Sequence, residues 1–228
     1  MRKYNWLKCA IILGVVPGLI FIGTRYFSGK SYYMICTLIL LALIFPFGLE
    51  YAAHKPSTKK MVLVASLSAI ATIGRVAFYM IPQFKPVLAI VIISAVIIGP
   101  YEGFIVGALT GFLSNFYFGQ GPWTVWQMFC FGFVGFLGGY LFRKIKVSRI
   151  SLSVYGLVSA IVIYGGIINF GSLVMTSSAI TKGSILAIYI SGFPYDCVHG
   201  IATYVFLFVI YRPFMEKLTR IKIKYDII

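Results

Sequence analysis

The chain has 228 residues, of which 60% are hydrophobic and 11% are charged, and its formal net charge is +15. Soluble domains carry about a quarter charged residues, so this composition excludes an ordinary soluble protein and indicates an all-α integral membrane protein. The positive charge does not indicate nucleic-acid binding, because the cations lie between apolar runs and in the tails rather than along one basic stripe.

Eight apolar stretches follow one another along the chain, and each is a candidate membrane-spanning helix. They cover residues 4–24, 31–52, 60–81, 86–100, 103–118, 123–142, 150–176 and 184–211. A span needs roughly 20 apolar residues, so the stretch 86–100, which has a proline at each end, is short. At the N-terminus, Arg2, Lys3 and Lys8 precede a long apolar core without a small-residue cleavage site, so we expect a retained signal anchor.

The Lys and Arg residues between these stretches predict the orientation. If both termini are cytoplasmic, fifteen of the 20 Lys and Arg residues lie on the cytoplasmic side, four lie outside, and Arg75 falls within a span. Cytoplasmic loops are rich in these residues, so we predict that both termini are cytoplasmic.

The stretch HKPSTKK, residues 54–60, is the most linker-like part of the chain. It divides the sequence into an N-terminal transmembrane hairpin, residues 1–56, and a block of six spans, residues 57–228, which ends in a basic cytoplasmic tail. Nearly all of the unusual polar residues fall in the second part.

Several polar residues interrupt the apolar stretches. Ionisable groups are costly inside a membrane and usually have a function. Arg75 lies in the third stretch, Asn115 ends the fifth and Asn169 interrupts the seventh, while Asp196 and His199 share one face of the last. Between the fifth and sixth stretches the sequence reads FGQGPWTVWQM, residues 118–128, which we interpret as a re-entrant or capping loop.

The predicted orientation places these polar groups at one depth, in the outer half of the membrane. We therefore predict a single pocket, open to the outside, in which a few polar groups anchor a ligand between apolar and aromatic walls. The candidate ligand-binding residues are Arg75, Tyr79, Lys85, Asn115, Tyr117, Gln120, Trp123, Thr124, Trp126, Gln127, Asn169, Tyr195, Asp196 and His199.

Each feature also has a purely structural interpretation. Arg75 and Asp196 could form a neutral bridge, the aromatic residues could form an interfacial belt, and the amides could hold helices together. An intramembrane enzyme with Asp196 and His199 as acid and base would need a nucleophile that the sequence does not offer. A stand-alone channel or secondary transporter also remains open.

Other patterns concern partners and metals. The four cysteines have no C-x-x-C spacing, so we predict no metal site. There is no G-x-x-x-x-G-K-[ST] motif, so the chain does not hydrolyse ATP itself. Glycines recur every four residues at Gly103, Gly107 and Gly111, which favours close helix packing within the bundle. Ala65 and Ala69 share one helix face and could meet another subunit.

Three segments carry a resemblance to a known family. They read ASLSAIATIGRVAFYMIPQFKP, SNFYFGQGPWTVWQM and SGFPYDCVHG, and they resemble the S components of energy-coupling factor (ECF) vitamin transporters over about residues 59–215. These S components are six-helix membrane proteins that capture a vitamin or its precursor from outside. The leading hairpin departs from that plan, so we expect an S-component-like bundle preceded by two further helices.

The resemblance implies several further properties. Ala65 and Ala69 match the A-x-x-x-A face that contacts the membrane coupling (T) subunit, which in turn binds two cytoplasmic ATPase subunits. The chain would then be a transport subunit rather than an enzyme. It would lie in the bacterial cytoplasmic membrane and bind no cofactor of its own, and the partner subunits would use the ATP.

The resemblance also bears on the substrate. The pattern G-P-W-T-x-W-Q-M looks most like the cobalamin-related branch, while riboflavin, pantothenate and a pyrimidine precursor remain open. Amide partners and aromatic walls suit a large ligand that is uncharged or weakly charged. A phosphate ligand would want more cations than Arg75 and Lys85.

Overall fold

The computed structural model describes residues 5–26, 32–54, 58–177 and 179–225, and these residues form helices without any strand. The boundary predicted between residues 56 and 57 lies outside them. The helices are α1 (Asn5–Ala10), the π-helical η1 (Ile11–Val15), α2 (Val16–Tyr26), α3 (Tyr32–His54), α4 (Thr58–Ala77), α5 (Val87–Ile97), α6 (Pro100–Phe118), α7 (Trp123–Leu141), α8 (Arg149–Val158), the π-helical η3 (Ser159–Tyr164), α9 (Gly165–Thr176) and α10 (Lys182–Lys224).

The described helices overlap the predicted stretches, and the largest difference in length is at the C-terminal end. The predicted count of eight membrane-spanning helices stays a prediction. Residues 212–224 were expected as a tail, but they continue α10, which spans 43 residues. Five helical runs in the described part are long and apolar enough to cross a membrane: Trp6–Thr24, Thr58–Ala77, Trp123–Leu141, Arg149–Thr176 and Lys182–Lys224. Two shorter apolar helices are Tyr32–Pro46 and Val87–Ile97. The chain is therefore an all-helical membrane protein.

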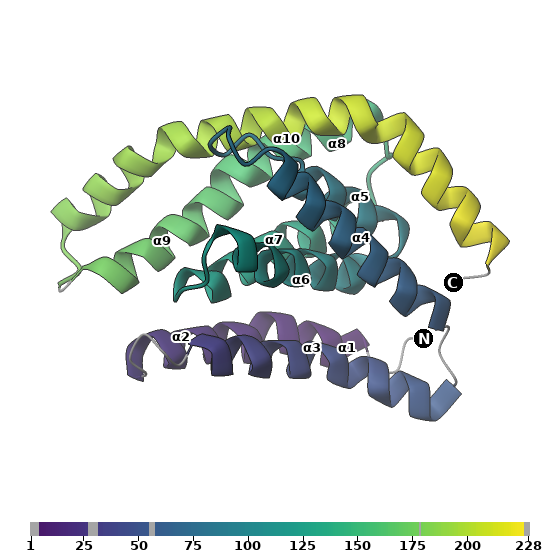
Figure 1. Cartoon of the computed structure of the whole chain (residues 1–228), viewed down its shortest axis with the longest axis horizontal. Coiled ribbons are helices and arrows are strands. Elements are labelled where there is room, and N and C mark those ends of the chain that lie inside the picture. Colours follow the sequence, from purple (N-terminus) through teal and green to yellow (C-terminus); the bar gives the residue numbers. More distant parts are fainter. Residues whose placement is uncertain (1–4, 27–31, 55–57, 178, 226–228) are drawn as a thin grey trace.

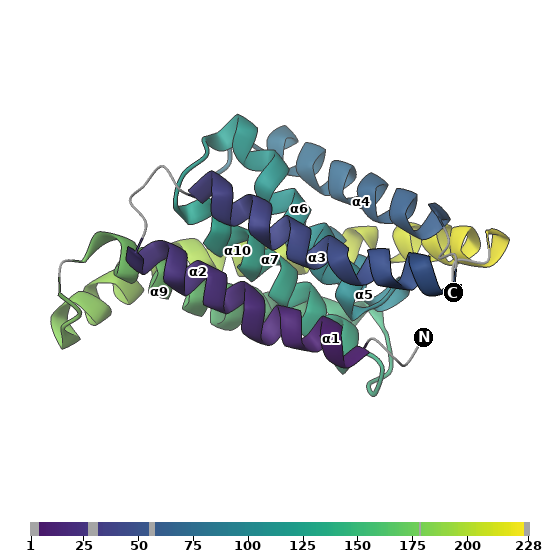
Figure 2. The ribbon, with the colours of Figure 1, turned by 90° about the horizontal axis from the view of Figure 1, so that it is seen from below.

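The helices pack in layers (Figure 1). The hairpin of α1, α2 and α3 lies along one side of α6 and α7, as the view from below also shows (Figure 2). Its buried face includes Ile12 and Ile39, and the Tyr101 hydroxyl of α6 donates a hydrogen bond to the Leu43 carbonyl of α3 at 2.6 Å. The hairpin is thus attached to the core both by apolar packing and by a defined polar contact.

The short helix α5 lies at the centre of the core. Leu88, Ile92 and Ile93 are completely buried, and α4, α6, α7 and α10 all contact this helix. A helix that is apolar on every side is stable when other helices enclose it. Its short length is therefore compatible with the fold, because neighbouring helices shield it from the surrounding lipid.

The glycine pattern of α6 brings it very close to its neighbours. A Cβ atom added at Gly107 would lie 2.5 Å from the backbone nitrogen of Gly132 in α7, and one added at Gly103 would lie against Ala95 of α5. Only glycine leaves room for this approach. The prediction that these glycines pack within the bundle is confirmed.

The long helix α10 arches over the bundle (Figure 1). Its N-cap residue is Thr181, whose hydroxyl accepts a hydrogen bond from the Ser184 backbone, while the Ser184 hydroxyl accepts one from the Thr181 backbone. Pro194 and Pro213 lie inside it, and each removes a backbone donor that would otherwise keep the helix straight. The start of α1 and the end of α10 lie at the same end of the molecule (Figure 1).

Candidate ligand-binding site

The stretch 118–128 contains a tight turn followed by a helix rather than a loop throughout. Gly119 has a φ of 97°, which favours glycine, and α7 begins at Trp123. The Gln120 side chain donates to the Phe112 carbonyl at 2.9 Å, and the Thr124 hydroxyl accepts from the Gly121 backbone at 3.2 Å. The predicted loop is therefore corrected to the four residues 119–122, and the following amide and hydroxyl side chains stand on a rigid helix.

Arg75 is the centre of a buried polar cluster that joins three helices. This α4 side chain is 7% exposed, and its Nη1 donates to Ser114 Oγ and, at 2.8 Å, to Asn115 Oδ1, both on α6. Its Nη2 donates to Gln127 Oε1 of α7 at 3.4 Å. The guanidinium thus donates hydrogen bonds to side-chain oxygen atoms of both neighbouring helices, and all of these partners are neutral.

Asn115 completes this cluster. Its Nδ2 donates to Gln127 Oε1 at 2.8 Å and to Thr124 Oγ1 at 3.0 Å, and the Thr124 hydroxyl donates to Gln120 Oε1 at 3.0 Å. A buried network in which the members satisfy one another holds each side chain in one orientation. Arg75, Asn115, Gln120, Thr124 and Gln127, five of the predicted site residues, are therefore brought together.

A cavity of about 150 Å³ adjoins this cluster. Arg75 lies against two of its walls, with Cζ 4.4 Å from the centroid of the Phe118 ring and 5.5 Å from that of Phe131. The His199 ring packs edge-on against the Tyr164 ring at 4.6 Å. The lining residues are Arg75, Pro82, Gln83, Lys85, Val87, Phe118, Gln127, Phe131, Tyr164 and His199.

Two irregular backbone segments border the cavity. Residues 78–86, between α4 and α5, contribute Pro82, Gln83 and Lys85, and Gln83 has a φ of 55°, in the left-handed region. On the other side, the π-helical η3 ends at Tyr164. Such π-helical segments occur frequently at functional sites. This neighbourhood supports the cavity as a candidate ligand-binding site despite its small volume.

Asn169 and Asp196 lie on a different groove. Asn169 Nδ2 donates to Asp196 Oδ2 at 2.8 Å, and both residues line a groove of about 440 Å³ between α9 and α10. Arg75 and Asp196 have separate partners, so the neutral bridge considered from the sequence does not form between these two described side chains. The predicted polar residues are therefore divided between two cavities and the buried cluster. The smaller cavity is lined by Arg75, Lys85, Gln127 and His199, and the groove by Asn169 and Asp196, while Asn115, Gln120 and Thr124 line neither.

The predicted aromatic residues lie mostly at the surface. Tyr79, Tyr117, Trp123 and Tyr195 are exposed, and Tyr79 and Tyr117 contact each other edge-on with centroids 5.3 Å apart. Trp126 is buried, but its ring packs against Gly171 of α9 and not on the cavity. This placement favours the interfacial belt for the four exposed rings.

Sequence reasoning missed several residues that line the cavity or support it. Ser114 contacts Arg75, and Phe118, Phe131 and Tyr164 form walls. Phe131 follows Gln127 by four residues and so shares its helix face, a spacing that could have identified it. Tyr164 gave no such indication, because its position depends on the π-helical turn.

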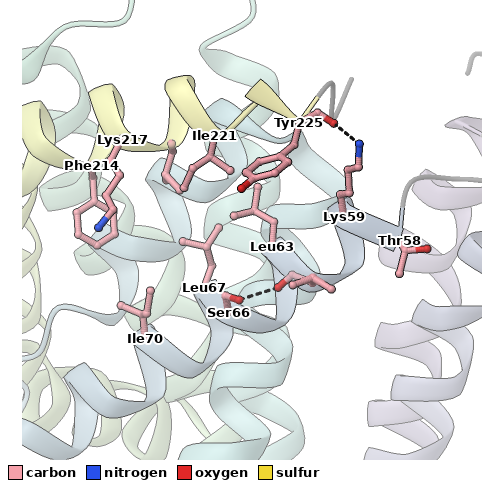
Figure 3. Close-up of a pocket in the computed structure, with 12 residues that line it drawn as sticks. Thr58, Lys59, Leu63, Ser66, Leu67, Ile70, Phe214, Lys217, Ile221 and Tyr225 are labelled. Carbon is pink, nitrogen blue, oxygen red and sulfur yellow. Dashed lines mark hydrogen bonds between the residues drawn. The ribbon is translucent and has the colours of Figure 1, made fainter. Parts of the chain in front are cut away.

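A larger groove lies at the opposite end of α4, beside the alanine face. It has a volume of about 720 Å³ between the start of α4 and the end of α10. Figure 3 shows Leu63 and Leu67 facing Ile221, while Lys59 Nζ donates to the Tyr225 carbonyl at 3.1 Å. Ala65 and Ala69 are exposed on α4. The lining of this groove is largely apolar, which suits contact with a protein or a lipid better than binding of a polar vitamin.

Comparisons with known proteins give one matching family model and several curated relatives. The family model described as the S component of the ECF-type riboflavin transporter matches residues 55–218. A UPF0397 protein of Vibrio atlanticus (strain LGP32) is 26% identical over 126 residues, which cover 51% of this chain and 68% of the relative. UPF0397 proteins of Aliivibrio salmonicida (strain LFI1238) and Aliivibrio fischeri (strain MJ11) are 29% and 28% identical with the same coverage.

No solved structure matches the chain. The family model nevertheless covers well over half of the residues, including α4 to α9 and most of α10. The chain therefore belongs to the family of ECF-type riboflavin transporter S components.

Proposed function

We propose that the chain is the high-affinity substrate-binding subunit of an ECF-type ABC importer, which captures a vitamin or vitamin precursor outside the cell for ATP-driven uptake. The observation that carries this proposal is the buried cluster of Arg75, Asn115, Thr124 and Gln127 beside an aromatic-walled cavity. The cluster and the cavity lie wholly within the residues that the family model matches.

The orientation and energy supply are part of this proposal. All eight helical segments would cross or enter the cytoplasmic membrane, with both termini in the cytoplasm. The common end of α1 and α10 supports an even number of crossings (Figure 1). The chain itself would bind no cofactor, and two ATPase subunits would use ATP and act through a coupling subunit.

The coupling subunit would contact the outward face of α4. Ala65 and Ala69 leave this face shallow, and the apolar groove beside it (Figure 3) offers room for part of a partner helix. Lys59 and Lys217 line the same groove, so acidic residues on the partner would strengthen the contact.

The identity of the ligand remains open within this function. The motif in residues 121–128 favours cobalamin, whereas the matching family is named for riboflavin. Ligand pockets usually have about 300 to 1,000 Å³, so the cavity of about 150 Å³ can enclose only part of either molecule. We expect the remainder to lie outside it or to displace residues 78–86.

Reconstitution in vesicles tests the proposal against its rivals. Vesicles with the chain alone should bind a vitamin without accumulating it, and accumulation should require the coupling subunit, the ATPases and ATP. Accumulation by the chain alone would instead indicate a secondary transporter. Conversion of the ligand by the chain alone would indicate an enzyme, although Asp196 and His199 line separate cavities.

A further inference from the structure

The charges around the small cavity are unbalanced. Its lining includes the cations Arg75 and Lys85 and no acidic residue. Of the described carboxylates, Glu102 pairs with Lys60. Neither Asp196, which accepts a hydrogen bond from Asn169, nor the exposed Glu216 forms an ion pair with Arg75 or Lys85. A buried cation with only neutral partners is unusual, because charges within a membrane are generally paired.

Both cations retain free hydrogen-bond donors. The described hydrogen bonds of Arg75 use three of the five N–H groups of a guanidinium. Lys85 Nζ donates to the Ile81 carbonyl at 2.9 Å and lies 5.4 Å from the centroid of the Phe118 ring, which leaves two further donors. Burial and the nearby Arg75 guanidinium both lower the pKa of Lys85, as expected where two cations share a site without a counter-ion.

A third group in the cavity also has unused hydrogen-bonding capacity. His199 is 3% exposed, and its Nδ1 has no hydrogen-bond partner among the described residues. An unpaired buried nitrogen atom costs free energy, and a bound ion or an ordered water is one way in which such an atom is satisfied. Arg75, Lys85 and His199 come from α4, from the segment before α5 and from α10, so three separate parts of the chain converge here.

We propose that this cavity receives an anionic group of the ligand, a carboxylate or a phosphate, held between Arg75 and Lys85. This revises the expectation from the sequence that the ligand is uncharged or weakly charged and that a phosphate would need more cations, because the lining of the cavity contains no acidic residue that could neutralise these two. The inference rests on the proposed function and narrows the substrate class to vitamins or precursors that carry a negative charge. The cavity of about 150 Å³ has room for such a group but not for a whole vitamin. Charge-assisted hydrogen bonds are about twice as strong as neutral ones, so one anion would satisfy both cations.

Matched pairs of compounds test this inference. Equilibrium binding would be measured with the purified full chain for flavin mononucleotide against riboflavin, pantothenate against pantothenol, and cobalamin, which carries a phosphodiester, against cobinamide. In the pair that binds, we expect the anionic member to bind at least about ten-fold more tightly, as one charge-assisted contact would produce.

Two variants of this chain make the test specific. Lys85→Gln should weaken binding of the anionic compound by about ten-fold and leave its neutral counterpart nearly unchanged. Lys182→Gln removes an exposed cation at the start of α10 and should affect neither compound. Lys85 lies in the segment between helices, so this substitution leaves the buried cluster around Arg75 in place.

Two outcomes would overturn the inference, and they can be distinguished. If the neutral member binds as tightly as the anionic one and Lys85→Gln has no effect, the anion site is wrong while the capture function stands. If folded protein binds none of the six compounds, the proposed function fails and the inference fails with it.

Discussion

Asn115 contacts three side chains in the buried cluster. Its oxygen accepts from Arg75, and its nitrogen donates to Thr124 and Gln127, so it links α4 to α7 through α6. Only an amide supplies an acceptor and two donors in this way. A hydrocarbon side chain of similar size would leave the partner groups in a buried place without their hydrogen bonds.

We therefore predict that Asn115→Leu weakens ligand binding by about ten-fold or more. It should also lower the free energy of unfolding by about 1 to 3 kcal/mol, because buried partners lose their hydrogen bonds. Binding and thermal unfolding of the purified protein measure the two effects. The control is Phe116→Leu, which changes the exposed side chain at the next position. If folded Asn115→Leu and this control bound the ligand with equal affinity, the prediction would be contradicted.

Much of this cluster could be predicted from residue type. Arg75, Asn115 and Gln127 are polar groups in apolar stretches, and such groups seek one another inside a membrane. What could not be predicted was the division between two cavities. Asn169 and Asp196 are also polar residues in apolar stretches, like those of the cluster. On α9 and α10, however, they line a separate groove. Their part in binding stays a prediction.

Between elements, the contact of α6 with α7 depends on small residues. A Cβ atom added at Gly107 would lie 2.5 Å from the Gly132 backbone nitrogen, a distance that forces the helices apart. These helices also carry Asn115 and Gln127. Their spacing therefore determines the geometry of the polar cluster as well as the stability of the bundle.

Gly107→Ala should lower the free energy of unfolding by about 1 to 3 kcal/mol, the usual cost of overpacking a core. Gly166→Ala in α9 is the matched control, because nothing lies within 4 Å of the added atom. Thermal unfolding in detergent compares the two variants. Equal unfolding temperatures would show that the helices can separate without cost.

The outward face of α4 leads to a separate prediction. Ala69→Trp adds a large side chain at an exposed position, so it should leave ligand binding unchanged and prevent assembly with the coupling subunit. Co-purification of the two subunits measures assembly. Val154→Trp on α8, also exposed, lies on a different helix and controls for bulk alone. Intact assembly of Ala69→Trp would remove the alanine face from the proposed interface.

The helical elements were largely predictable because long apolar runs in a membrane must form helices. Two features of the helices could not be predicted in this way. Residues 212–224 contain several Lys and Arg residues, which indicated a tail, yet Lys, Arg, Glu and Leu are all good helix formers. The π-helical η3 has an apolar sequence, SAIVIY, that does not distinguish it from an α-helix, so the position of Tyr164 could not be derived.

At the scale of the whole molecule, the hairpin is separate from the candidate site. Every residue that lines the small cavity lies between Arg75 and His199 in the sequence. The helix α3 contacts α6 and α7 but contributes no residue to this lining. The division at residues 56 and 57 remains a prediction, and the layered arrangement (Figure 2) is compatible with it.

A chain that starts at residue 57 should therefore bind the ligand within about two-fold of the full chain. It should unfold at a lower temperature, because it loses the apolar contact with the hairpin and the hydrogen bond from Tyr101 to Leu43. Parallel binding and melting measurements compare the two chains. Loss of binding in a folded truncated chain would make the hairpin part of the binding unit.

The central claim is that this chain captures its ligand without any ATPase. Equilibrium binding of a vitamin panel to the purified chain alone tests it most directly, with cobalamin, cobinamide, riboflavin, flavin mononucleotide, pantothenate and pantothenol as ligands. We predict tight, saturable binding of one ligand per chain, which is weakened in Asn115→Leu. Absence of binding by folded protein, or binding that appears only when ATPase subunits are added, would contradict the claim.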